Sequence, residues 1–393
     1  MTYKELIKSN LLVRRILTLQ FIVYFGAWFS DVAIYSMLVK YQASAFLIAS
    51  VTAMHFLPSI ILAPFSGAII DTFDRKKLMI SLCVIEIFCT AGLFTVHSLE
   101  LAWLLMILVF IRMGASAMFF LSGMSLTPQL VQGIALQRTN ELHSIIWSVT
   151  YASGMGLGGL VVNYFGIKAS FMIDILFFIL AISVLFITNF NIKPAIFREN
   201  FLKTIKDGFN YIIKNKVVLN LILLHASVGL TAFDTLVTLL ADYRYKYIIA
   251  TSLAIGITNA IRAIALAIGP LVLGKIVNKK ILFYIFIFQG LGIALWGVLE
   301  GNFYLSLLGV FCTGFSTATL WSFTYNLIQT NIEQKYLGRV LAYNDMVFML
   351  SNVATTFFIG FASSYMSLQN ITFCLAGMFF IVALYYKKVQ KYF

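Results

Sequence analysis

Five charged residues lie deep inside long apolar runs of the sequence, and their chemistry suggests a site that couples charge movement to function. They are Asp31, Glu86, Arg112, Asp234 and Arg262. An ionised side chain at the middle of a membrane costs at least about 2.5 to 3.5 kcal/mol, so such residues usually face a cavity or a partner. A partly dehydrated carboxylate can bind a proton, and an arginine can pair with it or with an anionic substrate. The alternative is a set of ion pairs that only fixes helix packing.

Other polar residues of the apolar runs give weaker signals. We expect Glu86 to be protonated and to face lipid or a neighbouring helix, and Asp174, nearer the outer interface, to be hydrated. His55 is a candidate for proton coupling, although a lone histidine in such a run more often packs through a hydrogen bond. The four histidines lack metal-ligand spacing and the four cysteines form no CxxC pair, so we expect neither a metal site nor a cofactor.

Composition identifies the elements that position these residues as membrane-spanning helices. Hydrophobic residues make up 61% of the chain and charged residues 11%, which is far outside the balance of soluble domains. Apolar runs of about 20 residues recur, and each can cross roughly 30 Å of hydrocarbon at about 1.5 Å per residue. We predict an all-α membrane protein with twelve transmembrane helices, near residues 16–39, 45–70, 77–97, 101–125, 140–165, 168–190, 218–241, 248–274, 281–299, 303–328, 339–365 and 369–386.

The basic residues predict the orientation of the chain in the membrane. With the N-terminus inside, cytoplasmic segments hold 22 of the 28 Lys and Arg residues, which is the pattern of positive inner loops. Both termini are then cytoplasmic, and the first apolar run is expected to be retained rather than removed as a signal peptide. Anionic lipids of the inner leaflet explain the net charge of +13, so we expect membrane lipids and not nucleic acid as partners. The expected location is a cell membrane, the inner membrane of a bacterium.

The chain consists of two related halves. Two glycine and aspartate pairs share residues and spacing: Gly26 with Asp31, and Gly229 with Asp234. Further matches follow in sequence order at offsets between 200 and 207, which indicates a parallel repeat with its axis along the membrane normal. We therefore expect a six-helix bundle over 1–190, a cytoplasmic linker with an amphipathic helix over 191–217, and a second six-helix bundle over 218–393.

The segment from Gly67 to Lys77, between the second and third spans, carries the most specific local pattern. Its sequence is Gly-Ala-Ile-Ile-Asp-Thr-Phe-Asp-Arg-Lys-Lys. It resembles the signature G-x-x-x-D-R-x-G-R-R of the major facilitator superfamily, and its D-R-K-K ending resembles the drug and siderophore exporter branch that contains macrolide efflux proteins. The resemblance implies the major facilitator fold and a conformational latch formed by Gly67, Asp71, Arg75 and Lys76. Asp71 is expected to pack against the start of the eleventh span, at residues 338–344.

Two further segments resemble the same branch. Arg112 and Gly114 are similar to the motif of the fourth helix. The fifth span contains a glycine run that is similar to the closely packed run of these exporters, with Gly154, Gly158 and Gly159 as the packing residues. Met155 stands where the antiporter motif of drug exporters has proline.

The resemblance implies a transporter and not an enzyme. We expect two bundles that alternate about a central site and export a small amphipathic organic compound while protons flow inward. Asp31 and Asp234 would carry the protons, and Arg112 would pair with them or contact a substrate anion. Arg262 and His55 are further candidates for substrate or proton binding. The protein is expected to act as a monomer.

Several alternatives stay open from the sequence. Related branches move lysophospholipids, metal ions or metal–siderophore complexes, and a passive channel, a scramblase or an intramembrane enzyme would belong to another class. An enzyme would require a clustered nucleophile and base or a metal-ligand set, and the sequence contains no such cluster. Aromatic residues could line the substrate path, although packing is their default role: Phe119, Phe120, Trp147, Trp321 and Tyr325.

Overall fold

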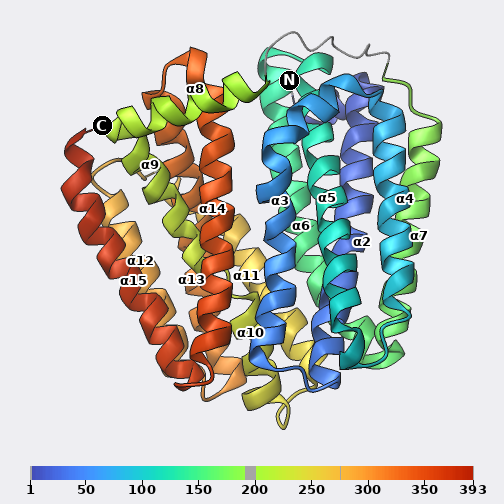
Figure 1. Cartoon of the computed structure of the whole chain (residues 1–393), viewed down its shortest axis with the longest axis vertical. Coiled ribbons are helices and arrows are strands. Elements are labelled where there is room, and N and C mark those ends of the chain that lie inside the picture. Colours follow the sequence, from blue (N-terminus) through green and yellow to red (C-terminus); the bar gives the residue numbers. More distant parts are fainter. Residues whose placement is uncertain (1, 191–200, 275, 393) are drawn as a thin grey trace. The chain divides into compact units, whose positions relative to one another are not determined.

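The computed structural model describes residues 2–190, 201–274 and 276–392. Within these ranges, some side chains lie outside the described part, namely those of Gly67, Ala68, Asp71, Gln137, 201–207, Gln334, Lys335 and Gly338. Throughout the described ranges, every regular element is a helix (Figure 1). The α-helices are α1 (Tyr3–Ser9), α2 (Leu11–Lys40), α3 (Ala45–Thr72), α4 (Arg75–Leu93), α5 (Ala102–Leu130), α6 (Gly133–Phe165), α7 (Ile167–Phe186), α8 (Phe201–Lys214), α9 (Lys216–Ala226), α10 (Asp234–Leu240), α11 (Thr251–Leu273), α12 (Leu282–Leu299), α13 (Phe303–Asn331), α14 (Gln334–Ala362) and α15 (Leu368–Val389).

Eleven helical segments of the described chain are long and apolar enough to cross a membrane. One of them, Lys216–Tyr245, combines α9, the short helix η2 (Ser227–Thr231), α10 and a final π-helical turn, η3 (Ala241–Tyr245). The third predicted span corresponds to α4, which is not among the eleven. It contains four charged residues, namely three basic residues at its start and Glu86, which is too many for an apolar segment of this length. The all-helical membrane architecture is therefore confirmed, and the count of twelve spans stays a prediction.

The chain forms two compact units. Unit 1 comprises Met1–Ala43, Phe65–Phe197 and Ile255–Ala260, and unit 2 comprises Ser44–Pro64, Arg198–Ala254 and Ile261–Phe393. Each unit has its own buried residues. The domain boundaries drawn from the sequence stay a prediction.

Glycines let the helices of unit 1 approach closely. In this unit α2 packs against α6 and α7, and α4 packs against α5 and α7 (Figure 1). A Cβ atom added to Gly154 of α6 would lie 2.7 Å from the Cβ of Trp28, and one added to Gly158 would lie 3.3 Å from the Cα of Phe29. Gly159 is the near neighbour of Gly256, whose added Cβ would lie 3.1 Å from its Cα. A Cβ atom at Gly154 would require its neighbour to shift, and one at Gly158 would require a smaller shift, so these glycines favour the close approach of the helices.

Unit 2 is built on a helix that is interrupted. In this unit α12 packs against α13 and α15, while α14 packs against α9 and η2. The break falls at Ala232, between η2 and α10, where the backbone leaves helical geometry with ψ at 76°. Gly229 stands in η2, and a Cβ atom there would lie 2.7 Å from the Cβ of Ser351 in α14. The sequence predicted a continuous span over 218–241, so the break is a finding of the structure.

A helix, α8, lies in the segment assigned to the linker, and its described residues pack against α14 of the same unit. The rings of Tyr211 and Tyr336 are stacked with centroids 4.1 Å apart, and Phe209 lies 6.0 Å from Tyr343. A Cβ atom on Gly208 would lie 2.9 Å from the Cβ of Arg339, so this glycine sets the closeness of the contact.

Candidate functional site

Four charged side chains from four different helices meet inside unit 1. Asp31 lies on α2, Glu86 on α4, Arg112 on α5 and Asp174 on α7, helices that run side by side (Figure 1). The guanidinium of Arg112 is the centre of the group. Its Nη1 lies 2.9 Å from Asp31 Oδ1, its Nε 3.2 Å from Glu86 Oε2, and its Nη2 3.4 Å from Asp174 Oδ2. We call these four residues the charge cluster.

The charge cluster is almost completely shielded from solvent. Arg112 and Asp174 are 0% exposed, Glu86 is 1% exposed and Asp31 is 6% exposed. Hydroxyl groups supply further hydrogen bonds: Ser30 and Thr90 donate to Asp174, and Ser116 donates to Glu86. Arg112 also donates from Nη2 to the carbonyl of Ala27 at 3.0 Å.

One guanidinium faces three carboxyl groups in this cluster. If all four groups were ionised, the buried net charge would be −2, and burying uncompensated charge is costly. Binding protons is the available way for the carboxyl groups to lose that charge without leaving the interior. The cluster is therefore a place where the protein can take up and release protons.

The helices explain why these four residues meet. Each residue lies between seven and ten residues from one end of its helix, which is the C-terminal end for α2 and α4 and the N-terminal end for α5 and α7. At about 1.5 Å per residue this is roughly 10–15 Å from that end. The expectation for Asp174 was wrong: its side chain is fully buried between α2 and α4 and is not hydrated near an interface. Glu86 faces its neighbouring helices and not lipid. A similar distance from the helix ends is the signal that could have placed both residues at the depth of Arg112, although it does not give the direction of their side chains.

The other coupling candidates lie in unit 2. Arg262 of α11 donates from Nη2 to the carbonyl of Thr231 at 2.6 Å, and its guanidinium carbon lies 5.2 Å from the ring centre of Phe233. Arg262 thus holds the last carbonyl of η2 at the helix break, three residues before Asp234, which begins α10. Within the described part of the chain, no ion pair involves Asp234. His55 lies on α3, with Nδ1 at 3.1 Å from the carbonyl of Val51 in its own helix.

The residues assigned to the latch are only partly described. The side chains of Gly67 and Asp71 lie outside the described residues. Arg75 is buried and donates to the carbonyl of Ile70, near the end of α3. Lys76 donates to the carbonyl of Phe186 at 2.7 Å, at the C-terminus of α7, where a cation is favourable. Both basic residues therefore bind helix ends of unit 1.

Aromatic side chains gather in unit 1 beside the charge cluster's own helices. The rings of Trp28, Trp147 and Tyr151 lie with centroids between 4.5 and 6.1 Å apart. Phe120 lies 5.3 Å from the ring of His143, which is buried. These residues come from α2, α5 and α6.

A second aromatic group occupies unit 2. Trp321 and Tyr325 of α13 are stacked at 5.0 Å with an interplanar angle of 14°. The ring of His225 lies 5.5 Å from Trp321 and 5.4 Å from Tyr325, and its Nδ1 is 2.8 Å from the hydroxyl of Thr324. Trp321 is 40% exposed whereas His225 is 0% exposed, so a partly accessible indole lies beside a buried histidine.

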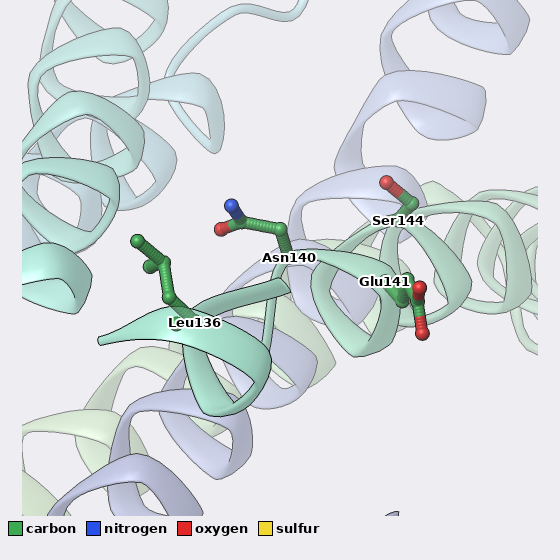
Figure 2. Close-up of a pocket in the computed structure, with 5 residues that line it drawn as sticks. Leu136, Asn140, Glu141 and Ser144 are labelled. Carbon is green, nitrogen blue, oxygen red and sulfur yellow. The ribbon is translucent and has the colours of Figure 1, made fainter. Parts of the chain in front are cut away.

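An open pocket of about 500 Å³ lies at the N-terminal end of α6 in unit 1. Asn140 and Ser144, one helical turn apart, point to the same side, whereas Glu141 points away from them (Figure 2). The carboxylate of Glu141 accepts a hydrogen bond from the hydroxyl of Tyr3 at 2.7 Å and pairs with Arg138 at 2.8 Å. The charge cluster lies toward the opposite ends of the helices, so this pocket is a separate feature.

Comparison with known proteins identifies a family and sequence relatives. Residues 16–354 match the profile of the family described as "Major Facilitator Superfamily". Macrolide efflux protein A of Streptococcus pyogenes is 25% identical over 333 residues, which cover 82% of this chain and 82% of that protein. The staphyloferrin A transporter of Staphylococcus aureus is 22% identical over 336 residues, again covering 82% of each chain.

A solved structure supports the fold. The chain superposes on a bacterial homolog of the human lysosomal transporter Spinster, in an inward-facing and unoccupied conformation, with a TM-score of 0.74. The superposition covers 97% of this chain and 96% of that one at 12% identity. At this identity the likeness concerns the fold alone.

Proposed function

Because the chain belongs to the Major Facilitator Superfamily, we propose that it exports a small amphipathic organic compound by alternating access, in exchange for protons that move inward. The charge cluster of unit 1 carries this proposal. Three carboxyl groups around one guanidinium can hold a variable number of protons in a place that is 0–6% exposed. The named activity of the Streptococcus pyogenes relative supports a macrolide as the compound to test first.

The ion pair between Asp31 and Arg112 is the coupling element in this proposal. Asp31 accepts a hydrogen bond from Arg112 Nη1 at 2.9 Å and is the most exposed of the three acidic residues. A proton on Asp31 neutralises its side of the pair and weakens its hold on the guanidinium. A change of conformation that separates the two groups would then favour protonation, and their return would favour release. Asp234 stands at the matching position of the second half and is proposed as a second proton site.

The aromatic groups would bind the compound. Aromatic faces bind apolar rings by contact and cations through the ring quadrupole. The partly exposed indole of Trp321 in unit 2 and the rings of Trp28 and Trp147 in unit 1 supply such surfaces. We also propose that the protein lies as a monomer in a bacterial inner membrane with both termini in the cytoplasm and lipids around it.

Retention of a labelled macrolide by cells tests this function. Cells that express the protein should retain less macrolide than cells with an empty vector, and a protonophore should abolish the difference. Asp31→Asn should lose the gradient-dependent export, whereas Glu100→Gln, a change at an exposed residue outside the charge cluster, should keep it. Equal retention in expressing and empty-vector cells with the gradient intact would contradict the proposal.

A metal–siderophore complex is the second candidate, because the Staphylococcus aureus relative is named for a siderophore. The same cells can be given a labelled ferric siderophore. Movement of the siderophore without movement of the macrolide would favour this candidate over the first.

A further inference from the structure

The two halves of the chain contain the same polar contact, once with an ionisable side chain and once with a side chain that cannot ionise. In the sequence repeat, Glu86 of unit 1 corresponds to Gln289 of unit 2, and Ser116 corresponds to Ser316. Their offsets of 203 and 200 fall within the range of the repeat. In unit 1 the hydroxyl of Ser116 donates to Glu86 Oε1, and in unit 2 the hydroxyl of Ser316 donates to Gln289 Oε1. Glu86 is 1% exposed and Gln289 is 0% exposed.

The contact made by the amide of Gln289 indicates what packing alone requires. The contact joins α4 to α5 in unit 1 and α12 to α13 in unit 2, and an amide makes it in unit 2 without any ionisable group. At the position of the repeat that corresponds to Arg112, unit 2 has Cys312. The acid and the guanidinium thus occur together in one half and are both absent from the corresponding positions of the other. Packing of these helices does not account for an acid at Glu86.

Among the three carboxyl groups of the charge cluster, Glu86 has the weakest support for a negative charge. Asp31 accepts a hydrogen bond from Arg112 Nη1 at 2.9 Å. Asp174 Oδ2 accepts from Ser30 and Thr90 as well as from Arg112 Nη2. Glu86 Oε2 and Arg112 Nε approach to 3.2 Å but lack hydrogen-bond geometry, so the hydroxyl of Ser116 is the donor to Glu86 in the described contacts.

We propose that Glu86 is a proton-binding site of the protein, the carboxyl group that holds a proton while Asp31 and Asp174 share the guanidinium. The carboxylate gains one proton and becomes a neutral acid, which changes the buried net charge of the cluster from −2 to −1. The groups that face Glu86 are Arg112 and Ser116 from α5, Asp174 from α7 and Asp31 from α2, with Cys83 and Cys89 on its own helix. Use of this proton in transport rests on the proposed function; its presence on Glu86 does not.

Infrared difference spectroscopy of the purified full chain tests the site directly. The parent at neutral pH should show the carbonyl stretching band of a protonated carboxylic acid. Labelling with ¹³C at the glutamate side-chain carboxyl should shift that band, which assigns it to a glutamate without any substitution. Glu86→Gln should remove it, and Glu86→Asp should keep a protonated-acid band that the glutamate label no longer shifts.

Glu300→Gln is the matched control, because Glu300 is the other glutamate that is 0–1% exposed in the described chain and it lies in unit 2. The band should survive in this variant. Glu86→Gln should fold, because its amide reproduces the contact of Gln289 with Ser316. A band unchanged in Glu86→Gln, insensitive to the glutamate label, or lost in Glu300→Gln instead would overturn the proposal.

A transport measurement separates this proposal from the proposed function. In proteoliposomes, Glu86→Gln should lose the component of macrolide transport that an imposed pH gradient drives and keep downhill movement. A gradient-driven component in the parent that persists in full in Glu86→Gln would show that the coupling proton is carried elsewhere. If the parent itself has no such component, the proposed function fails, and the infrared band still decides whether Glu86 holds a proton.

Discussion

Replacement of Arg112 by methionine is the perturbation whose consequence the structure defines most clearly. Arg112 is 0% exposed and three carboxyl groups lie within 3.4 Å of it, so its loss leaves those groups without their cation. Removing one partner of a buried ion pair costs about 3–5 kcal/mol. For a unit of about 150–250 residues, each kcal/mol lowers the unfolding temperature by about 2–4 °C, which gives a decrease of about 6–20 °C.

The pH dependence of this loss identifies its cause. In acidic buffer, protons can neutralise the three carboxyl groups in place of the guanidinium, so the deficit of Arg112→Met should shrink there and be largest in neutral buffer. Arg262→Met is the matched control, because Arg262 is also an intramembrane arginine but contacts a carbonyl and the ring of Phe233. Its deficit should not depend on pH in this way.

Thermal unfolding in detergent, followed by tryptophan fluorescence in acidic and neutral buffers, measures both effects. The reasoning is refuted if Arg112→Met unfolds at the temperature of the parent in neutral buffer. It is also refuted if the deficit is the same in both buffers.

Three further outcomes are expected. Gly154→Ala places a Cβ 2.7 Å from a tryptophan of α2 and should cost about 1–3 kcal/mol, whereas Gly377→Ala, in open space, should be neutral or stabilising by thermal unfolding; equal effects would contradict the packing. Burial raises the pKa of Glu300 above 4.5, against the opposing effect of its arginine partner, so the folded chain binds this proton more tightly than the unfolded chain. The free energy of unfolding should therefore decrease as pH rises through the raised pKa of Glu300, and this dependence on pH should be weaker in Glu300→Gln. An unchanged dependence on pH in Glu300→Gln would rule this out. Impermeant thiol reagents should label a cysteine placed at Ser98 in intact cells but one at Ser9 only after permeabilisation, and the reverse pattern would invert the proposed orientation.

The helical membrane architecture could be predicted from the sequence because it depends on bulk properties. Apolar runs of sufficient length indicate that the chain lies in lipid and that its spans are helical. Neither conclusion requires accurate positions of the side chains. The same reasoning placed α3, α5 and α13 within a few residues of their observed bounds. The interruption at Ala232 was missed because the apolar pattern continues through it, and the hydrogen bond from Arg262 that supports it is a tertiary contact.

The charge cluster could be predicted only in part. Opposite charge and similar depth in the membrane predict a pair between Asp31 and Arg112, and in the structure Arg112 Nη1 lies 2.9 Å from Asp31 Oδ1. Asp174 was misplaced because its burial is decided by the helices on either side and not by its distance from an interface. The direction of a side chain changes by about 100° for each residue of error in a helix with 3.6 residues per turn. Glu86 could therefore not be assigned to Arg112 from approximate span boundaries.

Proton movement driven by the substrate tests the central claim most directly. Proteoliposomes that contain a pH-sensitive dye are given a macrolide gradient with no imposed pH gradient, beside protein-free liposomes that correct for passive entry of a basic compound. Exchange of compound for protons predicts that macrolide entering the parent proteoliposomes drives protons out and makes the lumen more alkaline than in protein-free liposomes, and that Asp31→Asn lacks this excess. Protein-dependent macrolide entry with no change in luminal pH beyond the protein-free control would contradict the claim that transport is coupled to protons.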